Sequence, residues 1–445
     1  MTLTPDDAAG PELRRTMGYV RTTAMVVGII IGASIFVQPS QVTGAVPSKG
    51  GVLAVWLLSG LLTLIGALVI AELSSAWPHT GGVYVFLRRA YSPAAGFLWG
   101  WAMFWTMHTG IVAVIAMVFA RYVGTFVEMT DMGLRAMAIL GVAVVSAVNY
   151  VGVKPASLVQ ATLTFIKVFA IIVIIGAAFL VGAPAAPAPA GAGPPNAVSI
   201  SAFVTAMIAG LFSFGGWHMV SYSADETIDP ARTIPRALLA GTLLVTVLYV
   251  ALNSAYLHVL PMTAVASSTR VAADLADAIA PNAAGAEIVS ALVILSTLGA
   301  LNGVILAAPR VYFAMANDGL LFRRFSAVHP TFRTPHRAIA LQAVWASVLI
   351  GTNTYRDLFT RVVYTEWLFF AALAASLFVL RKRADYRPAY RLAGYPLWCS
   401  LFVAASLFIV VTQIVNEPRS SLTGLLLVLS GLPVYYLMSL NRSGA

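Results

Sequence analysis

Long apolar runs separated by short polar segments make up most of the chain, and this pattern predicts membrane-spanning helices. The hydrocarbon core of a bilayer needs about 20 mainly apolar residues per helix, and backbone polar groups inside it must be hydrogen-bonded within the protein. Twelve runs reach or approach this length, and the run at 337–352 is the shortest of them. The predicted spans are 19–43, 51–73, 94–124, 134–151, 157–182, 200–224, 237–260, 286–316, 337–352, 362–381, 395–415 and 421–440.

The composition agrees with a protein that uses lipid as its solvent. Of the 445 residues, 59% are hydrophobic and only 10% are charged, whereas a soluble domain carries about 25% charged residues. These values exclude a soluble enzyme, a disordered chain and a fibrous protein. Because residues 1–13 are acidic and polar and many apolar runs follow the first one, we expect no cleavable signal peptide.

The distribution of lysine and arginine predicts the orientation. The net charge of +10 lies in short loops between apolar runs, which is typical of a topology signal and not of nucleic-acid binding. With a cytoplasmic N-terminus, 19 basic residues fall on the cytoplasmic side, 7 fall outside, and Lys167 lies within a span. The positive-inside rule favours this choice, and an even number of spans then places both termini in the cytoplasm.

A segment rich in alanine and proline divides the first ten spans into five and five. Its prolines forbid a helix, and two inverted repeats are a common design among transporters. The expected organisation is a cytoplasmic tail at 1–18, a first five-helix repeat at 19–182, an extracellular linker at 183–199, an inverted five-helix repeat at 200–381, a basic cytoplasmic loop at 382–394, and two more helices with a short cytoplasmic C-terminus at 395–445.

Glycine-rich motifs interrupt the first span of each half, at 28–36 and at 210–217. Such interruptions at corresponding positions indicate a transporter's substrate site. The N-terminus of a half-helix offers N–H groups and a positive dipole end to a carboxylate, and free carbonyls at the preceding C-terminus suit an ammonium. The motifs therefore favour binding of a zwitterion such as an amino acid, although small residues also simply permit close helix packing.

Lys167 lies inside the fifth span with apolar sequence on both sides. Such a charge costs about 2.5–3.5 kcal/mol to insert, so it usually faces the bundle and has a partner. We expect its ammonium to tie the fifth helix to carbonyls of the interrupted first helix. The alternative is snorkelling to the inner interface, which is difficult about ten residues into the span.

The other polar residues within spans give weaker signals. His108 and His218 could relay protons, but a lone intramembrane histidine is more often a hydrogen-bonded packing residue. Glu366 is compatible with either a structural hydrogen bond or substrate contact. With one cysteine, Cys399, and neither a P-loop nor a nucleophile–base pair, the sequence predicts no metal site, no cofactor and no catalytic residues.

Several sequence blocks resemble the amino acid–polyamine–organocation superfamily, most closely its L-type amino acid transporter branch and the bacterial relatives of that branch. The resemblance covers nearly the whole chain. The blocks are 28–37, 71–73 with 78–82, 211–217 with 225–226 and 229–230, 296–303, and 316–320.

The resemblance implies an all-α fold of 12 transmembrane helices: a five-plus-five inverted repeat, discontinuous in its first and sixth helices, with two additional C-terminal helices. It implies that Phe212 is an aromatic lid, and that Lys167, with Ser296 as a partner, stands where sodium-driven relatives bind a second sodium ion. By analogy the carboxylate would meet N–H groups around Gly32 to Ser34, and the ammonium would meet carbonyls of Ile30, Phe212 and Gly215. The implied substrate-binding set is Ile30, Ile31, Gly32, Ala33, Ser34, Phe212, Ser213 and Gly215.

Two departures from the family pattern change what is expected. Where relatives commonly carry Gly-Ser-Gly, this chain has Gly32, Ala33 and Ser34, so a side chain at Ser34 alters the room for the carboxylate. Animal members join a heavy-chain subunit through a loop cysteine. The loop at 121–135 has none and Cys399 lies in a predicted span, so we expect no disulfide-linked partner.

The expected function is sodium-independent transport of neutral L-amino acids by alternating access in a bacterial inner membrane, as an exchanger or a uniporter. Neutral substrates are favoured because the membrane carboxylates look few and peripheral. The alternatives are a proton-coupled permease for cationic amino acids or polyamines, and an amino acid sensor with a transporter fold. An enzyme embedded in the membrane is disfavoured by the lack of a catalytic constellation.

Overall fold

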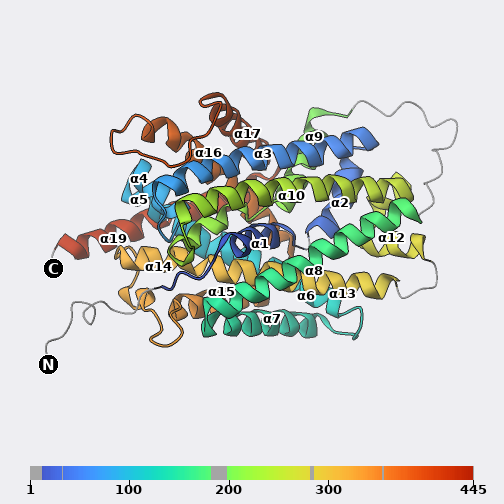
Figure 1. Ribbon diagram of the computed structural model, residues 1–445, viewed down its shortest axis with the longest axis horizontal. Coiled ribbons are helices and arrows are strands. Elements are labelled where there is room, and N and C mark those ends of the chain that lie inside the picture. Colours follow the sequence, from blue (N-terminus) through green and yellow to red (C-terminus); the bar gives the residue numbers. More distant parts are fainter. Residues whose placement is uncertain (1–12, 33, 182–197, 281–284, 353–354, 444–445) are drawn as a thin grey trace.

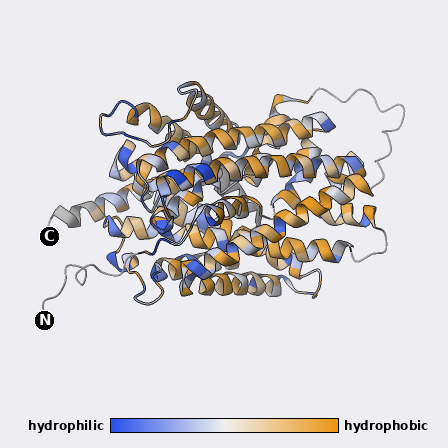
Figure 2. Cartoon of the chain, in the orientation of Figure 1, coloured by the Kyte–Doolittle hydropathy of each residue, from blue (hydrophilic) through white to orange (hydrophobic). Residues whose placement is uncertain are grey.

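The computed structural model describes residues 13–32, 34–181, 198–280, 285–352 and 355–443. Within these ranges the chain forms helices and loops, with one isolated bridge between Met17 and Thr227. The long helices run side by side along the longest axis of the molecule (Figure 1). Apolar residues cover their middle parts, while hydrophilic residues gather at helix ends and in loops (Figure 2).

The first half of the chain provides the helices that surround the N-terminal break. They are α1 (Tyr19–Ile30), α2 (Ser34–Ala45), α3 (Lys49–Ala76), α4 (Val83–Ala90), α5 (Pro93–Ala102), a π-helical segment (Met103–Met107), α6 (His108–Val123), α7 (Asp131–Val151) and α8 (Val153–Leu180).

The second half begins with another interrupted helix. Its elements are α9 (Ile200–Ser213), the 3₁₀ segment η3 (Trp217–Glu226), α10 (Pro230–Val259), α11 (Met262–Ser267), α12 (Val271–Ile279), α13 (Gly285–Ala307), α14 (Pro309–Asn317), η4 (Arg323–Ser326), α15 (His336–Thr352), α16 (Tyr355–Leu380), α17 (Leu397–Asn416), α18 (Pro418–Leu429) and α19 (Gly431–Ser443).

Nine of the described helical segments are long and apolar enough to cross a bilayer, or ten if α1 and α2 form one bent span. The expectation of an all-helical membrane protein is therefore confirmed. The count of 12 stays a prediction, because α15 has only 17 residues and the apolar part of α16, Glu366–Leu380, is also short.

One region outside the predicted spans is helical, because the segment after 260 contains the short helices α11 and α12. The predicted spans 286–316 and 421–440 each correspond to one candidate span, Glu287–Asn317 and Ser421–Met438. A helix boundary falls within each of them, at Ala308 before Pro309 in the first and at Ser430 in the second.

The interrupted helix α1 lies at the centre of the bundle, where it contacts α8, α10 and α13. Gly28 allows the approach to α8, since a Cβ at this position would lie 2.1 Å from Oγ1 of Thr164. The same Thr164 hydroxyl donates to the Ala24 carbonyl at 3.0 Å. Close packing by a small residue thus brings α8 and its lysine against the break in α1.

Candidate substrate site at two interrupted helices

The first break separates α1 from α2. Ile31 leaves the helical region with ψ of 87°, although its N–H still reaches the Val27 carbonyl at 2.8 Å. Gly32 N donates to the Ile30 carbonyl at 2.8 Å, which closes a tight turn in place of a helical hydrogen bond. The two helices meet at 45°. Since the first N–H groups of a helix lack intrahelical acceptors, the start of α2 at Ser34 is a potential anion site.

The second break separates α9 from η3. Phe214 N and Gly215 N donate to carbonyls only three residues back, and Gly216 takes the left-handed conformation with φ of 88°. A Cβ at Gly216 would also lie 2.3 Å from the Ile29 side chain. Glycine is therefore required here both for the backbone turn and for contact with α1.

One phenol lies against both breaks. The hydroxyl of Tyr249, on α10, is 3.0 Å from the Ile30 carbonyl and 3.1 Å from the Ser213 carbonyl. A single hydroxyl proton is thus shared between the C-terminal ends of α1 and α9. The periodicity of the span that contains Tyr249 carries no signal for this contact.

Lys167 lies at the break in α1 and not at the membrane interface. Its buried ammonium donates to the carbonyls of Gly28 at 3.0 Å, Ile31 at 2.7 Å and Ser296 at 3.1 Å. Ser296 also approaches the break through its hydroxyl, which is 3.4 Å from the Gly32 carbonyl. The three carbonyls hold the amino group of Lys167 where α1, α8 and α13 meet.

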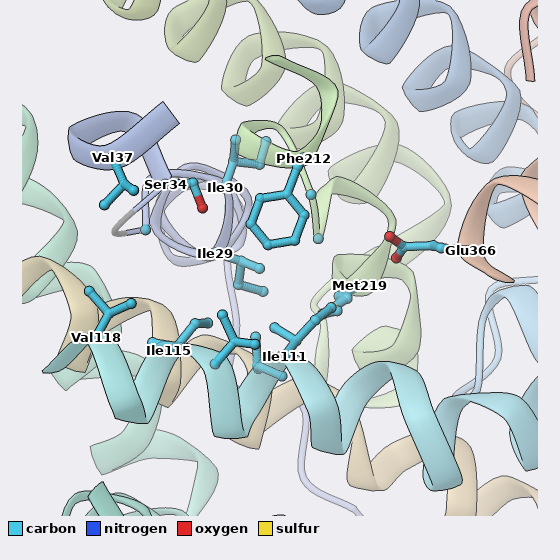
Figure 3. A pocket seen from close by; sticks show the side chains of 15 residues that line it. Ile29, Ile30, Ser34, Val37, Ile111, Ile115, Val118, Phe212, Met219 and Glu366 are labelled. Carbon is cyan, nitrogen blue, oxygen red and sulfur yellow. The ribbon is translucent and has the colours of Figure 1, made fainter. Parts of the chain in front are cut away.

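A cavity of about 50 Å³ lies between the two breaks. Figure 3 shows Phe212 between the α1 and α2 side of this cavity and Glu366. Isoleucine and valine side chains of α6 form the opposite wall. The lining residues are Ile29, Ile30, Gly32, Ser34, Val37, Ile111, Val114, Ile115, Val118, Phe212, Gly215, Gly216, Met219, Val304 and Glu366.

The cavity brings together most, but not all, of the residues expected to bind substrate. Those on the wall are Ile30, Gly32, Ser34, Phe212 and Gly215. Their roles remain predictions that the geometry accommodates.

The other three predicted binding residues are not on this wall. The side chain of Ile31 is buried while its carbonyl binds Lys167. The Ser213 hydroxyl points back to the Ala209 carbonyl of its own helix, at 3.4 Å. Ala33 lies outside the described residues.

Two of the carbonyls expected to hold an ammonium already accept hydrogen bonds. Ile30 accepts from Gly32 N and Tyr249, and Phe212 accepts from Gly215 N at 3.0 Å. A carbonyl oxygen has two lone pairs, so these two donors saturate the Ile30 carbonyl.

The buried acidic and imidazole side chains differ from their expected placement. Glu366 lines the cavity, so the view of all membrane carboxylates as peripheral is wrong for this residue. His218 lies 3.8 Å from Glu366, and neither of its ring nitrogens has a hydrogen-bond partner among the described residues. His108 is 3.4 Å from the hydroxyls of both Tyr222 and Tyr312.

A larger cavity of about 420 Å³ adjoins the central one at the end of the bundle that carries α2 and α12 (Figure 1). Val37 and Val118 line both cavities, so they form the boundary between them. Most residues that line the larger cavity are of polar types, and they include Arg121 and Arg270. We call this cavity the vestibule.

The opposite end of the bundle is closed by arginine–carboxylate pairs. Arg310 binds Glu226 through two hydrogen bonds of 2.9 and 2.8 Å, and both side chains are fully buried. Arg381 binds Glu72 in the same two-point manner, at 2.9 and 2.6 Å. These pairs join η3 to α14, and α3 to the end of α16, so they hold four segments together.

A third, partly exposed cluster connects α4 to the exit of α14. Arg88 pairs with Asp318, and the Tyr84 hydroxyl donates to the same carboxylate at 2.6 Å. Burial and the adjacent carboxylate raise the pKa of Tyr84, so its hydroxyl remains a proton donor. The chain before α1 also contacts this end, since Met17 N donates to the Glu226 carbonyl at 3.0 Å.

Two interrupted helices that face one solute-sized cavity, within a bundle of apolar helices, define a secondary transporter of the membrane. The chain belongs to the amino acid permease family, whose model matches residues 17–438. The resemblance seen in the sequence blocks is thereby confirmed.

Curated relatives align over nearly the whole chain. The serine/threonine exchanger SteT of Bacillus subtilis is 30% identical, over 97% of this chain and 98% of its own length. The human large neutral amino acids transporter small subunit 2 is 31% identical, over 96% of this chain and 81% of its own length. The human cystine/glutamate transporter is 28% identical, over 96% and 85%.

Proposed function

We propose that this protein exchanges small amino acids across a membrane, independently of sodium, by alternating access. The observation that carries the proposal is the pair of helix breaks at Ile30–Ser34 and Ser213–Trp217, which face one cavity. The start of α2 offers main-chain N–H groups to a carboxylate, and the end of α9 offers carbonyls to an ammonium. Exchange is favoured because the relative SteT is an exchanger by name.

We further propose the 12-span, five-plus-five organisation with inverted repeats. Its support is that each half begins with a span interrupted near its middle, α1 with α2 and α9 with η3. The vestibule would then be extracellular and the arginine–carboxylate end cytoplasmic, in accord with the positive-inside rule. On this assignment the protein is closed toward the cytoplasm, and Val37 and Val118 lie between the site and the extracellular vestibule.

Sodium independence is supported by Lys167. Three main-chain carbonyls surround its ammonium, as they would surround a bound cation. A sodium ion at the same place would meet both the charge and the volume of the ammonium.

Small substrates are favoured by the volume of the site. A water molecule needs about 10–15 Å³ of such space, so a cavity of about 50 Å³ holds the equivalent of a few waters. This suits a head group with a short side chain. The relatives' names include neutral and anionic amino acids, so they do not by themselves choose the side chain.

Reconstitution into proteoliposomes tests the proposal. Labelled serine or alanine outside should enter faster when unlabelled amino acid is present inside, and replacing sodium by choline should leave the rate unchanged. Binding without flux would instead indicate a sensor, and sodium-dependent uptake would contradict the role given to Lys167.

A matched pair of variants locates the site in the same assay. Phe212→Ala removes the ring that projects beside the cavity, and we expect exchange to fall about tenfold or more because the closed state loses this cover. Phe203→Ala, on the same helix but away from the cavity wall, should retain exchange. Equal loss in both variants would show a folding defect and not a lid.

A further inference from the structure

Glu366 differs from every other described residue on the cavity wall. The wall otherwise consists of main chain, the Ser34 hydroxyl, and apolar side chains. Only 8% of the Glu366 side chain is exposed, and its Oε1 atom has no hydrogen-bond partner among the described residues. Its carboxylate oxygens point toward the cavity from α16 (Figure 3).

The groups behind this carboxylate do not satisfy it. His218 lies behind it, but its Nε2 is 3.8 Å from Oε1, beyond hydrogen-bond distance. His218 is held by aromatic rings, among them Trp99 and Phe370. A buried carboxyl without a partner is costly, and one that is hydrogen-bonded is not. The missing donor can therefore come from the cavity side.

The cavity has two polar poles. Ser34 and the main chain at the start of α2 form one, and Glu366 forms the other, on the far side of Phe212 (Figure 3). An amino acid whose head group binds at the first pole directs its side chain along apolar walls toward the second. The small volume admits only a short side chain.

We propose that Glu366 is a specificity-determining residue, and that it selects amino acids whose short side chain ends in a hydrogen-bond donor, a hydroxyl or an ammonium. The inference rests on the proposed function, because it takes the head group to bind at the interrupted helices.

Three nearly isosteric probes test this selection in proteoliposomes: L-serine, L-2,3-diaminopropionate and L-2-aminobutyrate. They place a hydroxyl, an ammonium and a methyl group at the same position. A hydrogen bond is worth about fivefold in binding, and more where one partner is charged. The concentration that halves uptake of labelled substrate should be lower for serine, diaminopropionate or both than for 2-aminobutyrate, by this factor. Equal competition by all three would overturn the proposal.

Variants then assign the selection to this side chain. Glu366→Leu should bring the three competition constants to within about threefold of one another, while Glu366→Gln should lose diaminopropionate but keep serine, since an amide oxygen still accepts a hydrogen bond. Ser376→Ala, buried on the same helix and away from the wall, should keep the wild-type ratio. An unchanged ratio in Glu366→Leu would overturn the proposal.

A second measurement separates this inference from the proposed function. If the purified protein shows no exchange of any amino acid, the proposed function fails. Thermal stabilisation by the three probes in detergent still reports the selection in wild type and in Glu366→Leu. If wild type exchanges amino acids without a preference for donors, only the role of Glu366 fails.

Discussion

The two ends of the central cavity are closed by different kinds of interaction. Toward α14, buried arginine–carboxylate pairs such as Arg310 with Glu226 join separate segments. Toward α2, the boundary with the vestibule consists of the apolar side chains of Val37 and Val118. Opening the first end requires separating charges in a medium of low polarity, whereas opening the second requires only a shift of packed methyl groups.

Because of this difference, we expect the two ends to open with unequal ease during transport. The charged end can hold the closed state firmly, and the apolar end can exchange solute with little rearrangement. We expect opening toward the charged end to be coupled to the helix breaks, where Lys167 and Tyr249 join α1 to α8 and α10. The predictions below disturb one end or this connection, in order of expected effect.

The largest effect is expected at the charged end. Arg310→Ala leaves the fully buried Glu226 carboxylate without its partner, which should cost about 3–5 kcal/mol of folding free energy. Thermal unfolding in detergent measures the loss. The double variant Glu226→Leu with Arg310→Met removes both charges and should recover most of it. An Arg310→Ala protein as stable as wild type would show that the pair does not hold this end.

The connection between the ends depends on Lys167. Lys167→Met keeps the stem but leaves the carbonyls of Gly28, Ile31 and Ser296 without their donor, and each lost hydrogen bond costs about 0.5–1.5 kcal/mol. We expect a folded protein whose exchange rate is at least tenfold lower. The matched control is Lys154→Met, on the same helix and exposed. Equal exchange rates in the two variants would contradict the connection.

The apolar end should respond more weakly to a change of volume. Val118→Phe overfills the boundary. The overpacking should cost only about 1 kcal/mol, because the adjoining vestibule can take part of the ring. The apparent affinity for external substrate should fall about fivefold. Val118→Ala widens the same boundary and should not lower it. A fall of similar size in both would indicate general disorder of α6.

The smallest effect is expected for the exposed pair at the charged end. The Arg88 side chain is 40% exposed, so its pairing with Asp318 is worth about 1 kcal/mol or less. Arg88→Ala should therefore change unfolding temperature and exchange far less than Arg310→Ala. A loss of stability or exchange as large as that of Arg310→Ala would show that the strength of the two pairs does not depend on their burial.

Much of the fold could be predicted from local pattern. Apolar runs determine helical spans because the bilayer admits no unsatisfied backbone. The glycines at 28–36 and 210–217 mark both breaks, since Gly28 permits the close approach of α8 and Gly216 permits the turn after α9. Lys167 was also identifiable, since an isolated charge in an apolar span needs a partner. The helices α11 and α12 were missed, because they are short and have no membrane to impose a length.

The pairing of residues distant in sequence came only from the tertiary structure. Tyr249 bridges both breaks, Glu366 reaches the cavity, and Arg310 meets Glu226, yet nothing in the sequence identifies these partners. Apolar periodicity within a helix reports only that a face is buried. The arrangement of the other helices decides what this face meets, whether a pole of the cavity, a carbonyl or a carboxylate.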